Sequence, residues 1–246
     1  MQLLVSVQSA AEALAALDGG ADVIDAKDPH AGALGAVSLD ALHAIRAAVA
    51  RRRPVTAAIG DAGDEATVEA TARAFAAAGT RFVKVGFGGI TSAARVESLA
   101  AAAERGAASA VVLVAYADGD SRTSLTPGAL VDIAARVGAR GVLLDTADKY
   151  GLGLTRLLDQ RALTAWVNRA HDRGLFVALA GKLAAADLPL VRAAGADIAG
   201  VRGAACDGGR SGRISAERVR DLRAVLQRTA EASAERPTLG KSRVRP

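Results

Sequence analysis

Lysine is rare in this chain, and most of its lysines stand where they could do chemistry. The 31 basic residues include only five lysines, so the other 26 are arginines that supply most of the positive charge. Only lysine offers an amine that can lose its proton and attack a carbonyl carbon. Lys27, Lys84, Lys149 and Lys182 each lie in, or just after, a short apolar run. This placement predicts amine chemistry, either through a Schiff base or through proton transfer.

The second apolar run ends in an acid and an amine. Lys27 directly follows the run Val23–Ala26, which contains Asp25. Side chains two residues apart on a strand point to the same side, so Asp25 and Lys27 are expected to project together and to tune each other's charge. Asp28 and Pro29 then stop the strand. Lys27 is therefore a candidate nucleophile, and the alternative is an ordinary surface ion pair.

Two further groups of the same kind follow later in the chain. Lys84 lies inside the apolar run 82–86, and desolvation of a buried lysine prepares it as a base or as a Schiff-base amine. The alternative is an interior lysine neutralised by Asp25 or Asp145. Asp145 ends another apolar run, and Lys149 follows four residues later. Both are candidate site residues, although an ordinary loop pair is a strong alternative for Lys149.

Small residues follow the last two apolar runs and predict a phosphate site. In α/β barrels the loops after strands 7 and 8 often bind phosphate through backbone amides, and small residues allow a close approach. The residues predicted to bind substrate phosphate are Gly181, Lys182, Arg202, Gly203 and Ala204, with Arg210 and Arg213 as arginines that could add bidentate contacts.

These residues must be positioned by alternating strands and helices. Eight short runs, apolar on both faces as in covered parallel strands, alternate with helical segments. The alternation predicts an α/β fold, a single (β/α)8 TIM-type barrel whose active face lies at the carboxyl ends of the strands. An open doubly wound sheet is the alternative, but no glycine fingerprint follows the first run. The expected strands are Leu3–Val7, Asp22–Ala26, Val55–Ile59, Phe82–Gly86, Ala110–Ala115, Gly141–Leu144, Leu175–Ala180 and Ile198–Val201.

Local signals mark the first helix. Ser9 and Glu12 have the spacing of a capping box, in which each side chain accepts a hydrogen bond from the other residue's backbone N–H. Gly19 and Gly20 are expected to end this helix. Ser215 is expected to cap the last helix of the barrel.

Charge and domain limits argue against a nucleic-acid-binding protein. The net charge is 31 − 26 = +5, and residues 236–246 hold four basic residues and no acid, which leaves +1 for the rest. Only 3% of the residues are aromatic, which leaves little for bases to stack on. We expect residues 1–232 to form one catalytic domain and residues 233–246 to form a disordered basic tail.

Other features narrow the class of protein. The longest apolar run, at 110–117, is much shorter than the roughly 18 residues of a membrane span, and no export signal opens the chain. The single cysteine, Cys206, excludes an internal disulfide and favours the reducing cytoplasm. His30, His43 and His171 do not have the spacing of metal ligands. We therefore expect a cytoplasmic protein without a membrane partner. Its alanine-rich helices would permit a homo-oligomer.

A set of short motifs recurs in order along the chain. They are Leu3-Leu4-Val5-Ser6, Gly19-Gly20-Ala21-Asp22, Ile24-Asp25-Ala26-Lys27, Gly32-Ala33-Leu34-Gly35, Val83-Lys84-Val85-Gly86, Tyr116-Ala117-Asp118, Leu144-Asp145-Thr146-Ala147, Ala178-Leu179-Ala180-Gly181 and Gly200-Val201-Arg202-Gly203-Ala204-Ala205-Cys206. Up to about Leu226 the chain resembles the (5-formylfuran-3-yl)methyl phosphate synthase family, also called 4-(hydroxymethyl)-2-furancarboxaldehyde phosphate synthase, of methanofuran biosynthesis. The ordered set is more specific than any one motif.

This resemblance implies a lyase that joins two molecules of glyceraldehyde 3-phosphate and releases one phosphate and two waters to close a furan. It implies that Lys27 forms the Schiff base and that Lys84 accepts protons. Asp25, Asp145 and Lys149 match other active-site positions of the family. The resemblance implies a small phosphorylated triose as the substrate, and neither a metal nor an organic cofactor is needed.

Two other classes of function stay open. Another lysine-dependent aldolase or isomerase of triose phosphates would share the Schiff base or the proton transfer but would release no inorganic phosphate. A non-catalytic barrel that binds a phosphorylated ligand would keep the two phosphate loops and would have no need of Lys27.

Overall fold

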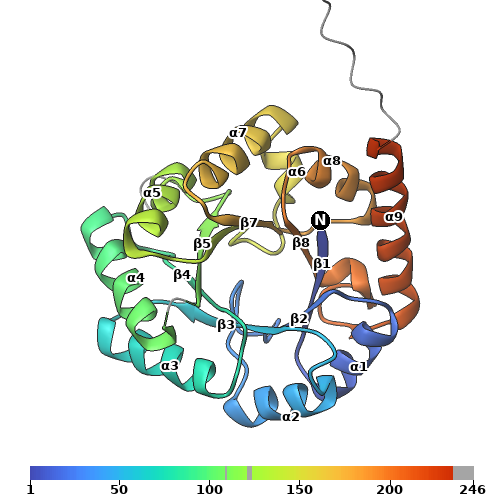
Figure 1. The fold of residues 1–246 in the computed structure, drawn as a ribbon, viewed down its shortest axis with the longest axis horizontal. Helices are drawn as coiled ribbons and strands as arrows, with labels where there is room; N and C mark the ends of the chain where they lie inside the picture. The colour runs from blue at the N-terminus through green and yellow to red at the C-terminus, as the bar shows by residue number, and fades with distance from the viewer. Residues whose placement is uncertain (109, 121–123, 235–246) are drawn as a thin grey trace, which may run out of the picture.

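Eight parallel strands close into a barrel, and helices surround it on all sides (Figure 1). The computed structural model describes residues 1–108, 110–120 and 124–234. Each strand pairs with its neighbours in chain order, and β8 pairs back onto β1. The strands are β1 (Gln2–Val7), β2 (Val23–Ala26), β3 (Val55–Asp61), β4 (Val83–Gly86), β5 (Val111–Tyr116), β6 (Gly141–Asp145), β7 (Phe176–Leu179) and β8 (Ile198–Val201).

The predicted TIM-type barrel is confirmed, and the open sheet is excluded because Gln2 of β1 lies opposite Ile198 of β8. β3 is two residues longer than expected, since Asp61 pairs with Gly86 after a bulge. The helices are α1 (Ala10–Asp18), α2 (Leu39–Val49), α3 (Glu65–Ala77), α4 (Ala93–Ala107), α5 (Pro127–Val137), α6 (Leu154–Leu157), α7 (Gln160–His171), α8 (Leu188–Ala193) and α9 (Ala216–Ala234).

The inside of the barrel is divided into an apolar floor and a polar upper part. Leu4, Val23 and Ile198 belong to a buried cluster inside the barrel, and the rings of Phe82 and Phe176 pack 5.1 Å apart beside it. Because side chains on a strand alternate with period two, the residue two positions further along each strand points into the same interior. The polar site residues therefore stand on a packed apolar floor.

The start of α1 differs from its prediction. Ser9 caps the helix as expected, accepting a hydrogen bond from the Glu12 backbone N–H at 3.3 Å. Glu12 does not return the bond to Ser9. Its carboxylate accepts from the Gln8 N–H at 2.9 Å and binds the guanidinium of Arg202. The expected capping box is thus wrong in its second half, because a buried cation competes for the carboxylate.

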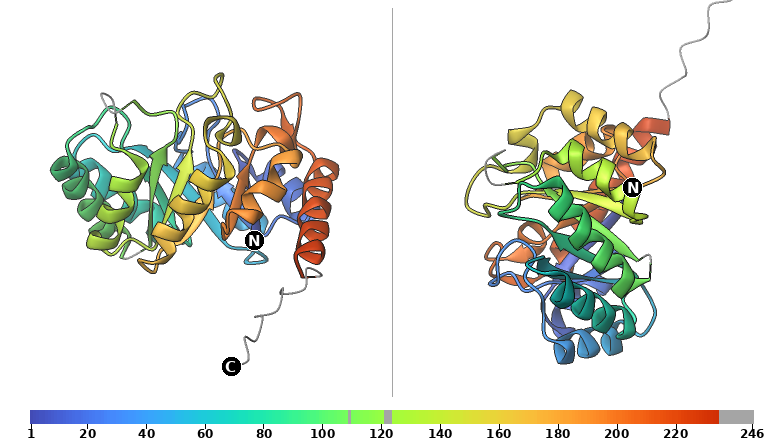
Figure 2. Two further views of the ribbon diagram at one scale, coloured as in Figure 1. Left: turned by 90° about the horizontal axis from the view of Figure 1, so that it is seen from above. Right: turned by 90° about the vertical axis from the view of Figure 1, so that its left-hand side faces the viewer.

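The active face of the barrel carries an unpredicted hairpin. The strands β9 (Cys206–Asp207) and β10 (Arg213–Ile214) pair antiparallel and shape the loop after β8. In Figure 2 the long loops rise at one end of the barrel, and the N-terminus lies toward the other end. No helix in the described residues is long and apolar enough to cross a membrane. Helix α9 runs to Ala234, and the predicted disorder of the tail concerns mainly residues 235–246, which lie outside the described residues.

Candidate active site

The centre of the site is the buried carboxylate of Asp25 on β2. The strand register places it opposite Ser6 of β1 and Thr56 of β3. Ser6 Oγ donates to Asp25 Oδ2 at 2.9 Å, and Thr56 Oγ1 donates to Oδ1 at 2.7 Å. The ammonium of Lys84, from β4, forms an ion pair with Asp25 Oδ2 at 2.5 Å. Four neighbouring strands thus contribute one polar side chain each to a single buried cluster.

The charges in this cluster support one another. Burial alone would raise the pKa of Asp25, but the ammonium groups of Lys84 and Lys27 outweigh burial and hold that pKa below its ordinary value. Asp25 therefore stays ionised and keeps a countercharge beside Lys84. This is the ion pair that the sequence allowed as a structural alternative for Lys84. The side chain also lines the cavity, so the pairing leaves it within reach of a bound molecule.

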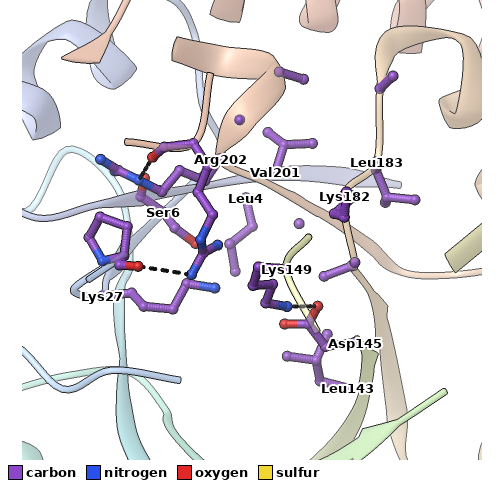
Figure 3. A pocket seen from close by; sticks show the side chains of 18 of the residues that line it. Leu4, Ser6, Lys27, Leu143, Asp145, Lys149, Lys182, Leu183, Val201 and Arg202 are labelled. Atoms are coloured by element: carbon purple, nitrogen blue, oxygen red, sulfur yellow. Dashed lines mark hydrogen bonds and ion pairs between the residues drawn. The ribbon is translucent and has the colours of Figure 1, made fainter. Parts of the chain in front are cut away.

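Lys27 differs from the other described lysines because its amine has no partner. The residue is 6% exposed, and its Nζ makes no hydrogen bond or ion pair within residues 1–108, 110–120 and 124–234. Burial lowers the pKa of Lys27 to about 8; Asp145 and Asp25 oppose this shift, whereas Lys84 and Lys149 add to it. In Figure 3 the side chain extends into the cavity toward the Asp145–Lys149 pair. An amine in this state can attack a carbonyl carbon.

Asp145 and Lys149 form a second ion pair on the opposite side. Lys149 Nζ lies 2.7 Å from Asp145 Oδ1 and also donates to the carbonyl of Thr146. Burial would raise the pKa of Asp145, but Lys149 and Lys27 outweigh it and lower that pKa. The exposed fractions of the two side chains, 9% for Lys149 and 2% for Asp145, show that this is a buried pair. The surface loop pair considered from the sequence is not what forms.

A carboxylate from the neighbouring loop holds the backbone that carries Lys149. Asp118, just after β5, accepts hydrogen bonds from the N–H groups of Ala147 and Asp148 at 2.7 and 2.8 Å. Tyr116, in the same motif, points elsewhere and donates to Asp61 Oδ1 at 2.8 Å. Neither residue is among those lining the cavity, so this motif supports the site from behind.

The cavity above these residues has a volume of about 620 Å³ and opens at the carboxyl ends of the strands. Its walls include the loops after β7 and β8, as predicted for a phosphate site. Gly181 and Lys182 both line the cavity and have positive φ angles, of 101° and 55°. A non-glycine residue such as Lys182 is uncommon at positive φ, and such residues often occur at functional sites. In the described part of the chain, no acceptor takes the N–H groups of Gly181, Lys182, Gly203 or Ala204. These four amides form a candidate phosphate cradle.

Arg202 is buried, and its guanidinium is fully engaged. It donates to both carboxylate oxygens of Glu12 at 2.8 and 3.2 Å, and to the carbonyls of Ser6, Arg210 and Gly212 at 3.0, 2.9 and 3.3 Å. These bonds use all five N–H groups of the side chain. The structure therefore does not support the predicted contact between this guanidinium and phosphate. Arg202 instead anchors the loop after β8 to β1 and α1.

Sequence reasoning missed the residues whose role depends on distant partners. Ser6 and Thr56 are ordinary residue types in strand patterns, and the capping-box spacing of Glu12 gives no sign of its distant partner. Their partners lie 19, 31 and 190 residues away. His30 lines the cavity and is exposed. No cluster of three or more metal-ligating residues occurs among the described residues.

Comparison with known proteins shows the family of this chain. A family model described as 4-HFC-P synthase matches residues 3–223. The chain belongs to the 4-HFC-P synthase family. The resemblance seen in the sequence is thereby confirmed over nearly the whole barrel.

Relatives in the 4-HFC-P synthase family match end to end. The chain is 39% identical over 233 residues to the (5-formylfuran-3-yl)methyl phosphate synthase of Methanopyrus kandleri, covering 92% of this chain and 98% of that one. The enzyme of the same name from Methanosarcina barkeri is 36% identical over 233 residues, with 92% and 100% covered. Among solved structures, 3-hexulose-6-phosphate synthase from Salmonella typhimurium has a TM-score of 0.65 at 19% identity, with 93% and 100% covered. That last likeness concerns the fold alone.

Proposed function

We propose that this protein condenses two molecules of glyceraldehyde 3-phosphate into (5-formylfuran-3-yl)methyl phosphate through a Schiff base at Lys27. The observation that carries the proposal is the buried amine of Lys27, which has no partner among the described residues and lies between two ion pairs, beneath a candidate phosphate cradle. The names of two relatives in the family support the product. The pathway implied by the family is the biosynthesis of methanofuran.

The state of Lys27 suits imine formation. With a pKa of about 8, roughly one amine in ten is neutral at pH 7. An ordinary lysine with the reference pKa would have only about one in several thousand neutral. The neutral amine attacks the aldehyde carbon, and water leaves. Burial thus raises the supply of the nucleophile by a factor on the order of 300.

The iminium then serves as an electron sink for the loss of phosphate. Removal of the proton next to the iminium carbon gives an enamine, and the enamine electrons expel the phosphate from the third carbon. We assign the proton transfers to Lys84 at the cavity wall: its ammonium gives a proton to the paired carboxylate of Asp25, and the neutral amine then takes the proton from the substrate. The unsaturated iminium left behind accepts the second triose at its third carbon. Ring closure loses two waters. Hydrolysis of the iminium then releases the six-carbon furan product from Lys27 and takes back the water that was lost when the imine formed.

The alternative of a non-catalytic binding barrel is less well supported. A binding protein gains nothing from a buried, unpartnered ammonium, because desolvating a charge without a partner lowers stability. Another lysine-dependent aldolase or isomerase would share Lys27 but would release no phosphate. One assay distinguishes the synthase from these two alternatives.

The test is incubation of the purified protein with glyceraldehyde 3-phosphate alone. Inorganic phosphate and the absorbance of a furan aldehyde are followed together, and we expect one phosphate per furan. Consumption of triose without either signal would favour an aldolase or isomerase, and no consumption would favour a binding protein.

A pair of matched variants tests the Schiff base. Lys27→Arg keeps the charge but cannot form an imine, so it should show neither turnover nor an adduct after reduction with borohydride. Lys149→Arg keeps the charge of an ion pair and should still form the adduct at Lys27. Measurable turnover by Lys27→Arg would rule out the assigned role.

A further inference from the structure

The proposed reaction brings two phosphates into one cavity, and they have different fates. One stays on the product, and the other leaves from the triose joined to Lys27. The phosphate that stays on the product needs hydrogen-bond donors that bind it throughout the reaction, such as the backbone amides of Gly181, Lys182, Gly203 and Ala204. A phosphate that leaves needs a cation close to Lys27, because negative charge builds on its bridging oxygen as the carbon–oxygen bond breaks.

Most of the cations that line the cavity are already engaged. Lys84 and Lys149 are paired with carboxylates. Lys182 Nζ donates to the carbonyl of Gly151, and all five N–H groups of Arg202 have acceptors. Apart from Lys27, the remaining cation among the arginines and lysines that line the described cavity is Arg210, which donates to backbone carbonyls through Nη2 alone.

Arg210 reaches across the cavity mouth from the hairpin after β8. Its carbonyl accepts from Arg202 Nε at 2.9 Å, which fixes its backbone. Its Nη2 donates to the carbonyl of Gly32 at 2.9 Å and more weakly to that of Pro29 at 3.4 Å. Both carbonyls belong to the loop that directly follows Lys27. The guanidinium is therefore held on the β2 side of the cavity, away from Gly181 and Lys182 on the β7 side.

The remaining N–H groups of Arg210 are available to a ligand. No acceptor within the described residues takes the hydrogens of Nε or Nη1. The side chain is half-buried, and burial lowers its pKa below the ordinary value, with Asp145 as the main charge that opposes the shift. A guanidinium that is partly desolvated and still charged binds phosphate oxygens more strongly than an exposed one.

We propose that Arg210 binds the departing phosphate of the triose attached to Lys27, at a subsite separate from the four-amide cradle. The proposal rests on the proposed function. In the elimination, the enamine electron pair breaks the bond between the third carbon and its phosphate oxygen. The electrons leave on the phosphate, whose added charge lies against the guanidinium. Arg210 is thus a catalytic residue for the elimination and has no part in forming the imine.

The first experiment does not depend on turnover. Equilibrium dialysis with labelled inorganic phosphate should find two phosphates bound per wild-type chain and one per chain in Arg210→Gln. Arg220→Gln is the matched control, because Arg220 is an exposed arginine of α9 that does not line the cavity, and it should bind two. Two phosphates bound by Arg210→Gln would overturn the proposal, and so would none, because the subsites would then not be separate.

The second experiment follows the elimination. With glyceraldehyde 3-phosphate and borohydride, the wild type should give a Lys27 adduct that has lost phosphate, whereas Arg210→Gln should give one that retains it. Phosphate release by Arg210→Gln should fall on the order of 100-fold, and Arg210→Lys should recover part of it. Release by Arg210→Gln at the wild-type rate would overturn the proposal. If the wild type itself releases no phosphate, the proposed function fails, and the dialysis still decides whether Arg210 forms a phosphate subsite.

Discussion

The lowered pKa of Lys27 means that the charged amine destabilises the folded protein. Replacing the amine with an uncharged group should remove this destabilisation. The pKa falls from 10.5 to about 8 on folding, and this difference corresponds to about 3 kcal/mol of destabilisation wherever both states are protonated. Lys27 Nζ has no hydrogen-bond partner in the described structure, so Lys27→Met breaks no bond there. At pH 7 we expect Lys27→Met to be more stable than the wild type by about 3 kcal/mol, although inactive. The unfolding temperature should rise by roughly 6–12 °C.

The sign and the pH window of this effect follow from the two pKa values. Between pH 8 and 10.5 the unfolded chain holds the Lys27 proton and the folded chain does not. The stability of the wild type relative to Lys27→Met therefore rises with pH across this window. The gap should be full below about pH 8 and should close near pH 10.5. Urea unfolding of both proteins at pH 7, 9 and 10.5 measures it.

The comparison of the two proteins cancels the titration of all other groups. A Lys27→Met variant no more stable than the wild type at pH 7 would refute the reasoning, because the ammonium would then carry no desolvation cost. A gap that stayed constant between pH 7 and 10.5 would also refute it. The gain would in that case come from packing of the methionine and not from loss of a charge.

Three further changes probe the supports of Lys27. Lys84→Met should lower the free energy of unfolding, measured in urea, by about 3–5 kcal/mol, because Asp25 loses its buried countercharge. The double variant Asp25→Asn with Lys84→Met should recover most of this loss. If it recovers none, the ion-pair account is contradicted. Asp118→Ala should lower stability by about 1–2 kcal/mol. It should also speed hydrogen exchange in residues 147–153, whereas unchanged exchange there would show that Asp118 does not hold the loop.

The fold and the place of Lys27 at the end of a strand could be predicted because both follow from local patterns. Alternating apolar runs and helices predict the barrel, and Lys27 and Asp145 stand at strand ends where the active face must lie. The environment of Asp25 could not be predicted in this way. Ser6 and Thr56 reach it only through the pairing of β1, β2 and β3, which depends on the register of three strands. That Lys27 has no partner within the described part of the chain also appears only in three dimensions.

The role of Arg202 shows a different limit. An arginine beside a glycine-rich loop is a reasonable phosphate ligand from sequence, but a carboxylate 190 residues away in the chain binds it instead. Glu12 had an adequate local explanation as half of a capping box, which concealed the distant one. The hairpin of β9 and β10 was not predicted either, because its glycines are typical of an open loop.

The bond between Glu12 and Arg202 also bears on the order in which the protein is made. It joins the first helix to the loop after the last strand of the barrel, so it forms only after almost the whole chain has left the ribosome. Closing a loop of this length costs conformational entropy, and the pairing of β8 with β1 offsets this cost only once both strands are present. Until then Glu12 has no cation beside it, and the four-amide cradle lacks two of its members. Lys27 and Asp25 are synthesised early, yet the cavity around them is completed last.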